Sequence, residues 1–208
     1  MNIESTHTIL RKSLGLTAAL SITLMMLASA SATTLLKLDL ETLTSKSEAI
    51  VQGTVSEIEY TKQDGRIYTY ITLNVKEVLK GSQGMKEVQF RVLGGRVGDL
   101  ITVVHGTPQF QQDEEVLVFL ERPLADKPLV VTGMVQGKFH VAVGPDQQTE
   151  YIVPDIKDTP LVEPLKVEDK QGQIATRLKE TEPDQTHSQV ITLDAFKLQI
   201  KELQNTQK

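Results

Sequence analysis

The fold is decided by residues 64–75, which read Asp-Gly-Arg-Ile-Tyr-Thr-Tyr-Ile-Thr-Leu-Asn-Val. The pair Asp64-Gly65 predicts a tight hairpin turn, because both residues tolerate the positive φ that such a turn demands. From Ile67 onward, apolar side chains occupy mainly alternate positions, and polar or aromatic side chains fill the positions between them. This alternation predicts a strand that turns one face toward a core and the other face toward solvent.

Further strands are predicted on both sides of this hairpin. The preceding stretch, residues 50–55, is rich in β-formers, and its Gly53 is a candidate bulge because a strand interior gains nothing from glycine. The following strands are predicted at residues 88–92, 100–104, 115–121, 129–132 and 138–143. Closely spaced strands with turn signals between them favour a mainly β fold, a small barrel or sandwich, over alternating strand and helix units.

The N-terminal segment, residues 1–32, is typical of a secretory signal peptide. It has a positive flank at residues 11–12, an apolar run over residues 14–27 and small residues at 28–32 for cleavage. The apolar run is shorter than the roughly 20 residues needed to cross a bilayer, which favours cleavage over anchoring. We therefore expect a mature chain that begins at Thr33, has no stable membrane insertion, and is periplasmic or extracellular.

Composition excludes several classes of function. The 208 residues include no cysteine, and the formal net charge is −5. The absence of cysteine removes thiolate catalysis, thiol redox chemistry and cysteine zinc sites. It also means that an exported chain must rely on packing and strand pairing in place of disulfides. The acidic balance disfavours a nucleic-acid partner.

Four parts follow from these patterns. They are the signal peptide at residues 1–32, a β domain with a short N-terminal helix at 33–153, a polar connector at 154–189 and a C-terminal helix at 190–208. The leucines and acidic residues of Leu35–Ser47 suit the first helix. The connector is polar, charged and aperiodic, which predicts loose order. In the last part, Thr192 is a candidate cap for an amphipathic helix with Phe196 and Ile200 on its apolar stripe.

Short motifs in the β domain suggest a relationship. They are Ile50-Val51-x-Gly53-x-Val55, Tyr68-Thr69, Val78-Leu79-Lys80-Gly81 and Val116-Leu117-Val118-Phe119-Leu120, with Gln136–Phe139 following them. Their order, over about residues 47–143, resembles that of the netrin-like, tissue-inhibitor-of-metalloproteinase barrel and of uncharacterised exported bacterial proteins. The resemblance implies a small OB-like barrel, closed or partly open, between the two helices. Inhibitors of that family chelate a protease zinc through an N-terminal cysteine, which this chain does not have.

The sequence offers little material for catalysis or metal binding. The histidines after residue 32 are His105, His140 and His187, and no serine lies in a Gly-x-Ser-x-Gly elbow. His105 lies at a predicted strand end, which favours a structural role, and His140 is expected to point outward. This pair is too sparse for a metal site. We therefore predict no catalytic residue, no metal and no cofactor.

Two predicted loops carry residues that could hold an ion. Asp113-Glu114-Glu115 offers carboxylate oxygens for calcium but lacks the alternating ligand pattern of a dedicated loop, which favours a solvated turn. Gly94–Gly98 would present backbone amides to an anion but lacks the fingerprint of a nucleotide-binding loop, which favours a plain turn.

The candidate binding residues are Tyr68, Tyr70, Asn74 and Arg91, on the outward face of two neighbouring strands. Tyrosine is an amphipathic contact residue, and OB-type barrels commonly use this face for ligands. Cross-strand tyrosines also stabilise sheets without any ligand, so both interpretations stay open. The sequence thus predicts an exported, non-catalytic binding protein with a protein or peptide partner. The alternatives are a netrin-like protease inhibitor and a hydrolase that uses His105 or His140.

Overall fold

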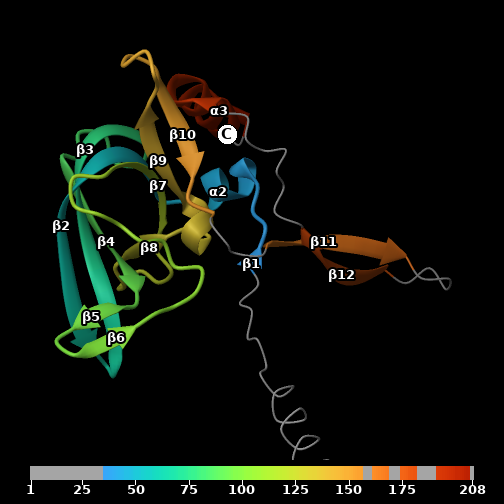
Figure 1. Ribbon diagram of the computed structural model, residues 1–208. Coiled ribbons are helices and arrows are strands. Elements are labelled where there is room, and N and C mark those ends of the chain that lie inside the picture. The colour runs from blue at the N-terminus through green and yellow to red at the C-terminus, as the bar shows by residue number, and fades with distance from the viewer. Residues whose placement is uncertain (1–34, 157–160, 169–173, 182–190, 207–208) are drawn as a thin grey trace, which may run out of the picture. The chain divides into compact units, whose positions relative to one another are not determined.

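The structure is a computed structural model that describes residues 35–156, 161–168, 174–181 and 191–206 (Figure 1). The predicted signal peptide and His187 lie outside the described residues. The described chain is mainly β, with two α-helices and a short 3-10 helix. The strands are β1 (Leu35–Leu36), β2 (Ala49–Gln63), β3 (Arg66–Lys80), β4 (Glu87–Leu93), β5 (Gly95–Val97), β6 (Leu100–Thr102), β7 (Glu115–Glu121), β8 (Leu129–Val131), β9 (Lys138–Val143), β10 (Glu150–Pro154), β11 (Leu161–Glu168), β12 (Ile174–Thr181) and β13 (Ile191–Thr192). The helices are α2 (Leu40–Lys46), η1 (Met134–Gly137) and α3 (Leu193–Thr206).

Strands β2 and β3 form the predicted long hairpin and lie side by side in Figure 1. Its turn is Asp64-Gly65, with φ of 51° and 76°, the left-handed conformation that this dipeptide tolerates. Along β3, Ile67, Ile71 and Leu73 are all buried. The predicted alternation is therefore confirmed for the core-facing side chains, whereas Thr72, on the opposite face, is buried as well.

Five strands form a closed ring of pairings in the order β2, β3, β4, β8, β7 and back to β2. All of these pairs are antiparallel except β4 with β8, which is parallel. One edge of β7 pairs with β2. Along the other edge, Leu120 and Glu121 pair with β8, and Val116–Val118 pair with β9. From β9 the sheet continues through β10 to β13.

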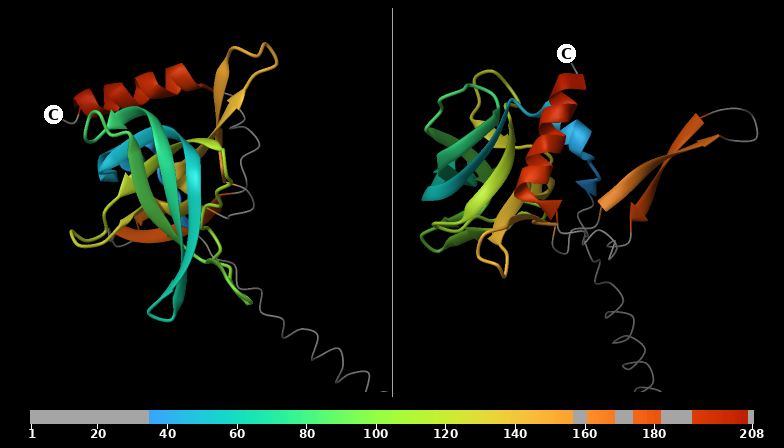
Figure 2. Two further views of the ribbon diagram at one scale, coloured as in Figure 1. Left: turned by 90° about the vertical axis from the view of Figure 1, so that its left-hand side faces the viewer. Right: turned by 90° about the horizontal axis from the view of Figure 1, so that it is seen from above.

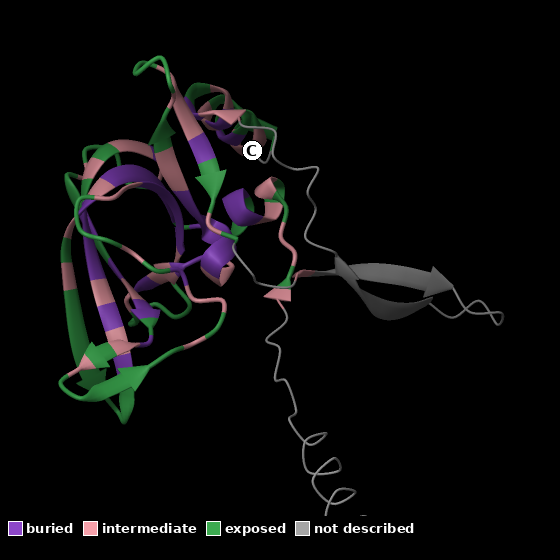
Figure 3. Cartoon of the chain, in the orientation of Figure 1, coloured by how far each residue is buried: buried purple, intermediate pink, exposed green. Residues whose placement is uncertain are grey.

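Two hydrophobic cores lie on opposite faces of β2 and β7. The first is lined by the inner faces of the ring strands and includes Phe90 and Val118. The second contains Phe119 of β7 together with side chains from both α-helices. This explains the unbroken apolar run of β7, since a strand buried on both faces has no position for a polar side chain. Figure 3 shows the buried residues along these strands.

Helix α3 supplies much of the second core. Its predicted stripe is confirmed, with Leu193, Phe196 and Ile200 buried, and Thr192 Oγ1 accepts a hydrogen bond from the backbone N–H of Ala195 at 3.3 Å. The Phe196 ring lies 5.0 Å from that of Phe139. Figure 2 shows α3 running past the end of β3. Over the described residues, no helix has both the length and the hydropathy needed to span a bilayer.

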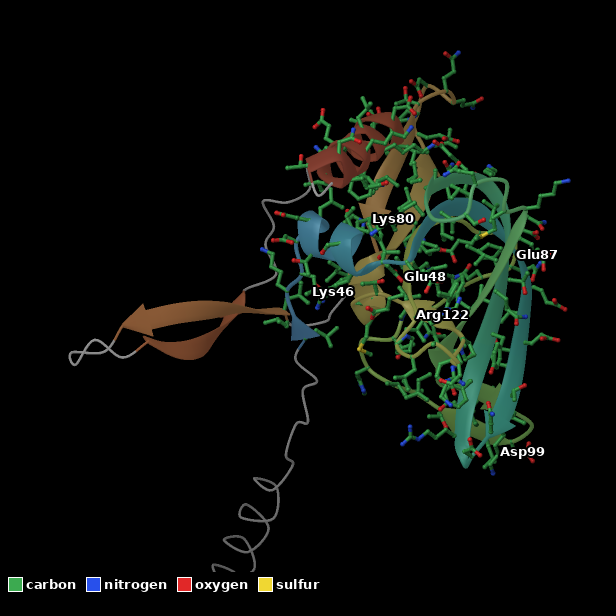
Figure 4. All side chains as sticks on the ribbon, turned by 180° about the vertical axis from the view of Figure 1, so that it is seen from behind. Lys46, Glu48, Lys80, Glu87, Asp99 and Arg122 are labelled. Atoms are coloured by element: carbon green, nitrogen blue, oxygen red, sulfur yellow. The ribbon has the colours of Figure 1, made fainter. Side chains whose placement is uncertain are left out.

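Helix α2 is shorter than the predicted helix, since the chain forms β1 before it. Asp39 caps α2 by accepting a hydrogen bond from the Thr42 N–H at 2.7 Å, and bonding to Thr42 lowers the pKa of Asp39. Lys80 donates to the Thr44 carbonyl at 2.7 Å. Glu48, which follows α2, accepts two hydrogen bonds from Arg122. Both residues are labelled in Figure 4.

Strands also lie in two segments for which the sequence predicted none. Within the segment at 154–189, predicted as a loosely ordered connector, β11 and β12 pair in antiparallel register over eight residues, and β1 adds in parallel to β11. Strand β5 occupies part of the predicted plain turn Gly94–Gly98 and pairs with β6 around Gly98-Asp99. Neither pair of strands was predicted, because strands with polar residues on both faces show no local periodicity.

Gly53 provides a test of the packing between β2 and β3. The register shifts between Gln52 and Gly53, and a Cβ at Gly53 would lie 2.5 Å from the Asn74 carbonyl oxygen. Gly53→Ala is therefore expected to lower the free energy of unfolding by about 1–3 kcal/mol, the usual cost of overpacking. Urea unfolding would measure the change, with the exposed Thr61→Ala in the same strand as the control. An unchanged free energy for Gly53→Ala would contradict this account of the bulge.

Candidate functional site

Three of the four predicted binding residues come together on the sheet face opposite the core. Tyr68 and Tyr70 alternate with buried neighbours along β3, and each is half-buried. The guanidinium carbon of Arg91 lies 4.3 Å from the centre of the Tyr68 ring, which is a cation–π contact. Tyr70 pairs directly with Arg91 across the strands. Asn74 is exposed but lies farther along β3, opposite Glu87, and is not part of this group.

The neighbouring strands extend this group into a continuous surface. Glu59 of β2 pairs with Tyr70, and Leu93 of β4 pairs with Tyr68, so both side chains lie on the same sheet face as the tyrosines. We call Glu59, Tyr68, Tyr70, Arg91 and Leu93 the outer face. It presents two aromatic rings, one charge of each sign and a leucine that is 37% exposed. Such a mixture suits contact with a protein surface or a peptide.

A second group of charged side chains lies where β9 begins and β10 ends, and sequence reasoning did not find it. Its centre is Lys138, whose side chain is only 1% exposed. The Lys138 ammonium nitrogen lies 2.8 Å from Glu114 Oε1, 3.5 Å from Asp155 Oδ2 and 4.6 Å from the centre of the Phe110 ring. It also contacts the Gln109 carbonyl oxygen. A buried lysine needs such partners, because an unpaired charge is very costly away from water.

His140 completes this group by bridging the two carboxylates. Its Nδ1 lies 2.5 Å from Glu114 Oε1, and its Nε2 lies 2.8 Å from Asp155 Oδ1. The contact of Nε2 with Asp155 is a hydrogen bond, whereas Nδ1 and Glu114 Oε1 are close without forming one. We call Lys138, Glu114, His140 and Asp155 the Lys138 cluster. Glu114 and Asp155 are 14% and 15% exposed, so the cluster is largely shielded from solvent.

One atom of the Lys138 cluster is close to two nitrogens without being well bonded to either. Glu114 Oε1 is buried, and neither Lys138 nor His140 meets it at the angle of a true hydrogen bond, despite the short distances. Its contact with Lys138 is therefore better described as an ion pair, and its contact with His140 as a close polar contact. A buried acceptor in this state is unusual and calls for an explanation.

The Lys138 cluster corrects two predictions. The side chain of Glu114 is not in a solvated turn, and the ring of His140, although 32% exposed, does not simply point into solvent. The backbone turns at Asp113, with φ of 63°, and this turn brings Glu114 back toward β9. The sequence held one sign of this cluster. Lys138 lies between Gly137 and Phe139 at the start of an apolar strand, where a charged side chain needs a buried partner.

His105, the other histidine considered as a base or metal ligand, has no such surroundings. His105 is exposed after β6, and within the described ranges it makes no ion pair or side-chain hydrogen bond. Nor do the described residues contain a group of three or more His, Cys, Asp or Glu side chains able to hold a metal ion. In the Lys138 cluster, the carboxylates and the imidazole already contact one another and Lys138.

A hollow of about 500 Å³ lies between β3, the loop after it and α3. The charged side chains that line it are already paired. Glu77 lies 2.7 Å from Lys197 and 3.6 Å from Lys201, and Lys76 lies 2.5 Å from Glu115. The hydrogen bond from Lys197 lowers the pKa of Glu77. These charges stabilise the attachment of α3 and leave the hollow with no evident ligand.

No family model, curated protein or solved structure matches this chain. Its function is therefore inferred from the geometry of its own residues.

Proposed function

We propose that this chain is an exported, non-catalytic binding protein whose partner is a protein or peptide that contacts the outer face. The observation that carries the proposal is the stack of Arg91 on Tyr68 beside Tyr70, on a sheet face where both tyrosines are half-buried and Leu93 is 37% exposed. Tyrosine and arginine are enriched at protein interfaces, and they dominate binding energy there. A signal peptide at residues 1–32 would deliver the protein to the periplasm or the medium.

The ring of strands supports the finer proposal of an OB-like barrel. When β2, β3, β4, β7 and β8 are numbered 1 to 5 in chain order, their order around the ring is 1-2-3-5-4. Strands 3 and 5, which are β4 and β8, are parallel. An OB-fold is a five-stranded Greek-key barrel in which the second and third strands commonly carry the ligand face. Here these strands are β3 and β4, which carry Tyr68, Tyr70 and Arg91.

A netrin-like protease inhibitor is the second candidate, and the same strand order favours it. Because the chain has no cysteine to chelate a protease zinc, inhibition would have to use another contact, for which the outer face is available. Adding the purified protein to a panel of secreted metalloproteases tests this candidate. Undiminished protease activity across the panel would remove it and leave the broader binding proposal in place.

Replacing both tyrosines tests the binding proposal. Tyr68→Ala with Tyr70→Ala is expected to weaken capture of the partner at least about tenfold, because aromatic anchors at an interface typically contribute more than 1 kcal/mol each. The measurement is crosslinking and pull-down from the native secreted fraction, followed by titration of the captured protein against each variant. The melting temperature should stay nearly unchanged, since both rings are only half-buried.

The matched control is Tyr60→Ala. Tyr60 is 51% exposed on β2, but it pairs with the buried Thr69 and so belongs to the opposite sheet face from the outer face. Capture by Tyr60→Ala should equal capture by the natural chain. If the double variant retains equal affinity, the outer face is not the binding site.

A further inference from the structure

The Lys138 cluster brings together the groups needed for an amide condensation. Lys138 provides an amine, and Asp155 provides a carboxyl group whose Oδ2 lies 3.5 Å from that nitrogen. The two residues are also cross-strand neighbours, because the Asp155 N–H donates a hydrogen bond to the Lys138 carbonyl at 3.3 Å. The pair is thus held together by the backbone before any bond between the side chains forms. Holding reactants in contact removes most of the entropic cost of their reaction.

The surroundings disfavour the ion pair and favour the uncharged product. The Lys138 side chain is 1% exposed, and its nitrogen lies over the Phe110 ring, which itself packs against Phe90 of the inner core at 5.2 Å. Buried charges lose their hydration, whereas an amide carries no net charge. Little water reaches the nitrogen to reverse the reaction.

The geometry points to an intramolecular amide bond between Lys138 Nζ and Asp155 Cγ. Glu114 Oε1, 2.8 Å from the ammonium, takes one proton and leaves a neutral amine. The amine attacks Asp155 Cγ, a C–N bond forms, and the bond from Cγ to Oδ2 breaks. Oδ2 leaves as water with two protons from the original ammonium, one of them returned by Glu114. The ammonium and carboxylate become an amide and water, so charge and atoms balance without any oxidant or cofactor.

Glu114 and His140 have separate roles in this step. His140 Nε2 lies 2.8 Å from Asp155 Oδ1, where an N–H would stabilise the negative charge that develops on that oxygen. Glu114 Oε1 lies within reach of both Lys138 and His140, and its unsatisfied hydrogen-bonding capacity suits a group that receives and returns a proton. The poor hydrogen-bond geometry of that atom is thereby explained. This is a single reaction within the chain, and it does not depend on the proposed binding function.

The amide would do for this chain what a disulfide does elsewhere. It would close a loop that contains the whole β9–β10 hairpin, and closing a loop lowers the entropy of the unfolded chain. The protein has no cysteine with which to make such a link in the oxidising compartment to which its signal peptide would direct it.

Mass spectrometry of the folded protein tests the amide. Cleavage after glutamate separates Lys138, in residues 122–150, from Asp155, in residues 151–163. We expect these two peptides to stay joined, with a combined mass about 18 Da below their sum because one water is lost. Fragmentation should place the link at Lys138 and Asp155. Two separate peptides of full mass would show an ion cluster only and overturn the proposal, and a link to Glu114 would overturn the assignment of Asp155.

Variants separate the roles of the residues. Asp155→Ala removes the acceptor, and Glu114→Gln removes the proton carrier while keeping its size, so both are expected to give unlinked chains of full mass. Lys197→Met is the matched control, because the Lys197–Glu77 pair, at 2.7 Å, is closer than the Lys138–Asp155 pair, at 3.5 Å, but lies nearer the surface. That variant should retain the link. If Asp155→Ala fails to fold, the digest of the natural chain still decides the question.

Discussion

Replacing Lys138 by methionine is expected to lower the free energy of unfolding by about 3–5 kcal/mol, the usual cost of removing one partner from a buried ion pair. Loss of the proposed amide would have a cost of the same order, as loss of a disulfide does. Methionine preserves most of the volume of the side chain but leaves Glu114 and Asp155 without their lysine partner. Both carboxylates are largely buried, so water replaces the lost contact poorly. Urea unfolding of the two proteins, monitored by far-UV circular dichroism, measures the difference.

The control is Lys197→Met in α3. Lys197 pairs with Glu77 at 2.7 Å, but the Glu77 side chain is 38% exposed. Its loss is expected to cost below about 1 kcal/mol, as is typical of exposed pairs. Equal effects of the two substitutions would mean that the Lys138 cluster contributes no more than a surface ion pair does.

Phe119→Ala is expected to cost about 3–5 kcal/mol, since it leaves a cavity in a fully buried site. The ring is 0% exposed and lies 5.7 Å from the ring of Phe139 and 6.4 Å from that of Phe196. Loss of the ring would therefore weaken both the packing of β7 against β9 and the packing of β7 against α3. The melting temperature and the free energy of unfolding should both fall, with the near-UV signal of the aromatic core reduced.

Leu124→Ala is the matched control for Phe119→Ala. Leu124 is an apolar residue close in sequence but 61% exposed, so its truncation should change the free energy of unfolding by no more than about 0.5 kcal/mol. The cost of Phe119→Leu in free energy of unfolding should lie between those of Phe119→Ala and Leu124→Ala. A cost for Phe119→Ala no larger than that of the control would contradict the second core as described.

Local patterns predicted the elements that depend on local chemistry. The Asp64-Gly65 turn was evident because few dipeptides favour positive φ at both residues. The strand after it was evident from its alternation, and α3 from the spacing of Phe196 and Ile200. In each case the deciding residues lie within one or two turns or a few strand positions of one another.

Contacts between distant segments were not predictable in this way. Glu114 precedes β7, Lys138 begins β9 and Asp155 follows β10, and each considered alone suggests a solvated charge. Their meeting depends on how β7, β9 and β10 pair, which no local period encodes. The same holds for the parallel contact of β4 with β8 and for the addition of β1 to β11. Three of the predicted binding residues were grouped correctly because they lie on two strands joined by one short connection.

The order of strands around the ring has a consequence for synthesis. Strand β8 closes the ring between β4 and β7, yet it is the last of the five to leave the ribosome. Until then, β4 has an unpaired edge, the kind of edge that invites pairing with other chains. Helix α3, which covers the second core, emerges later still. We therefore expect the ring to close only after β8 has been synthesised, and folding to be slow because it depends on contacts between distant segments. Until then, the incomplete chain should need protection from aggregation.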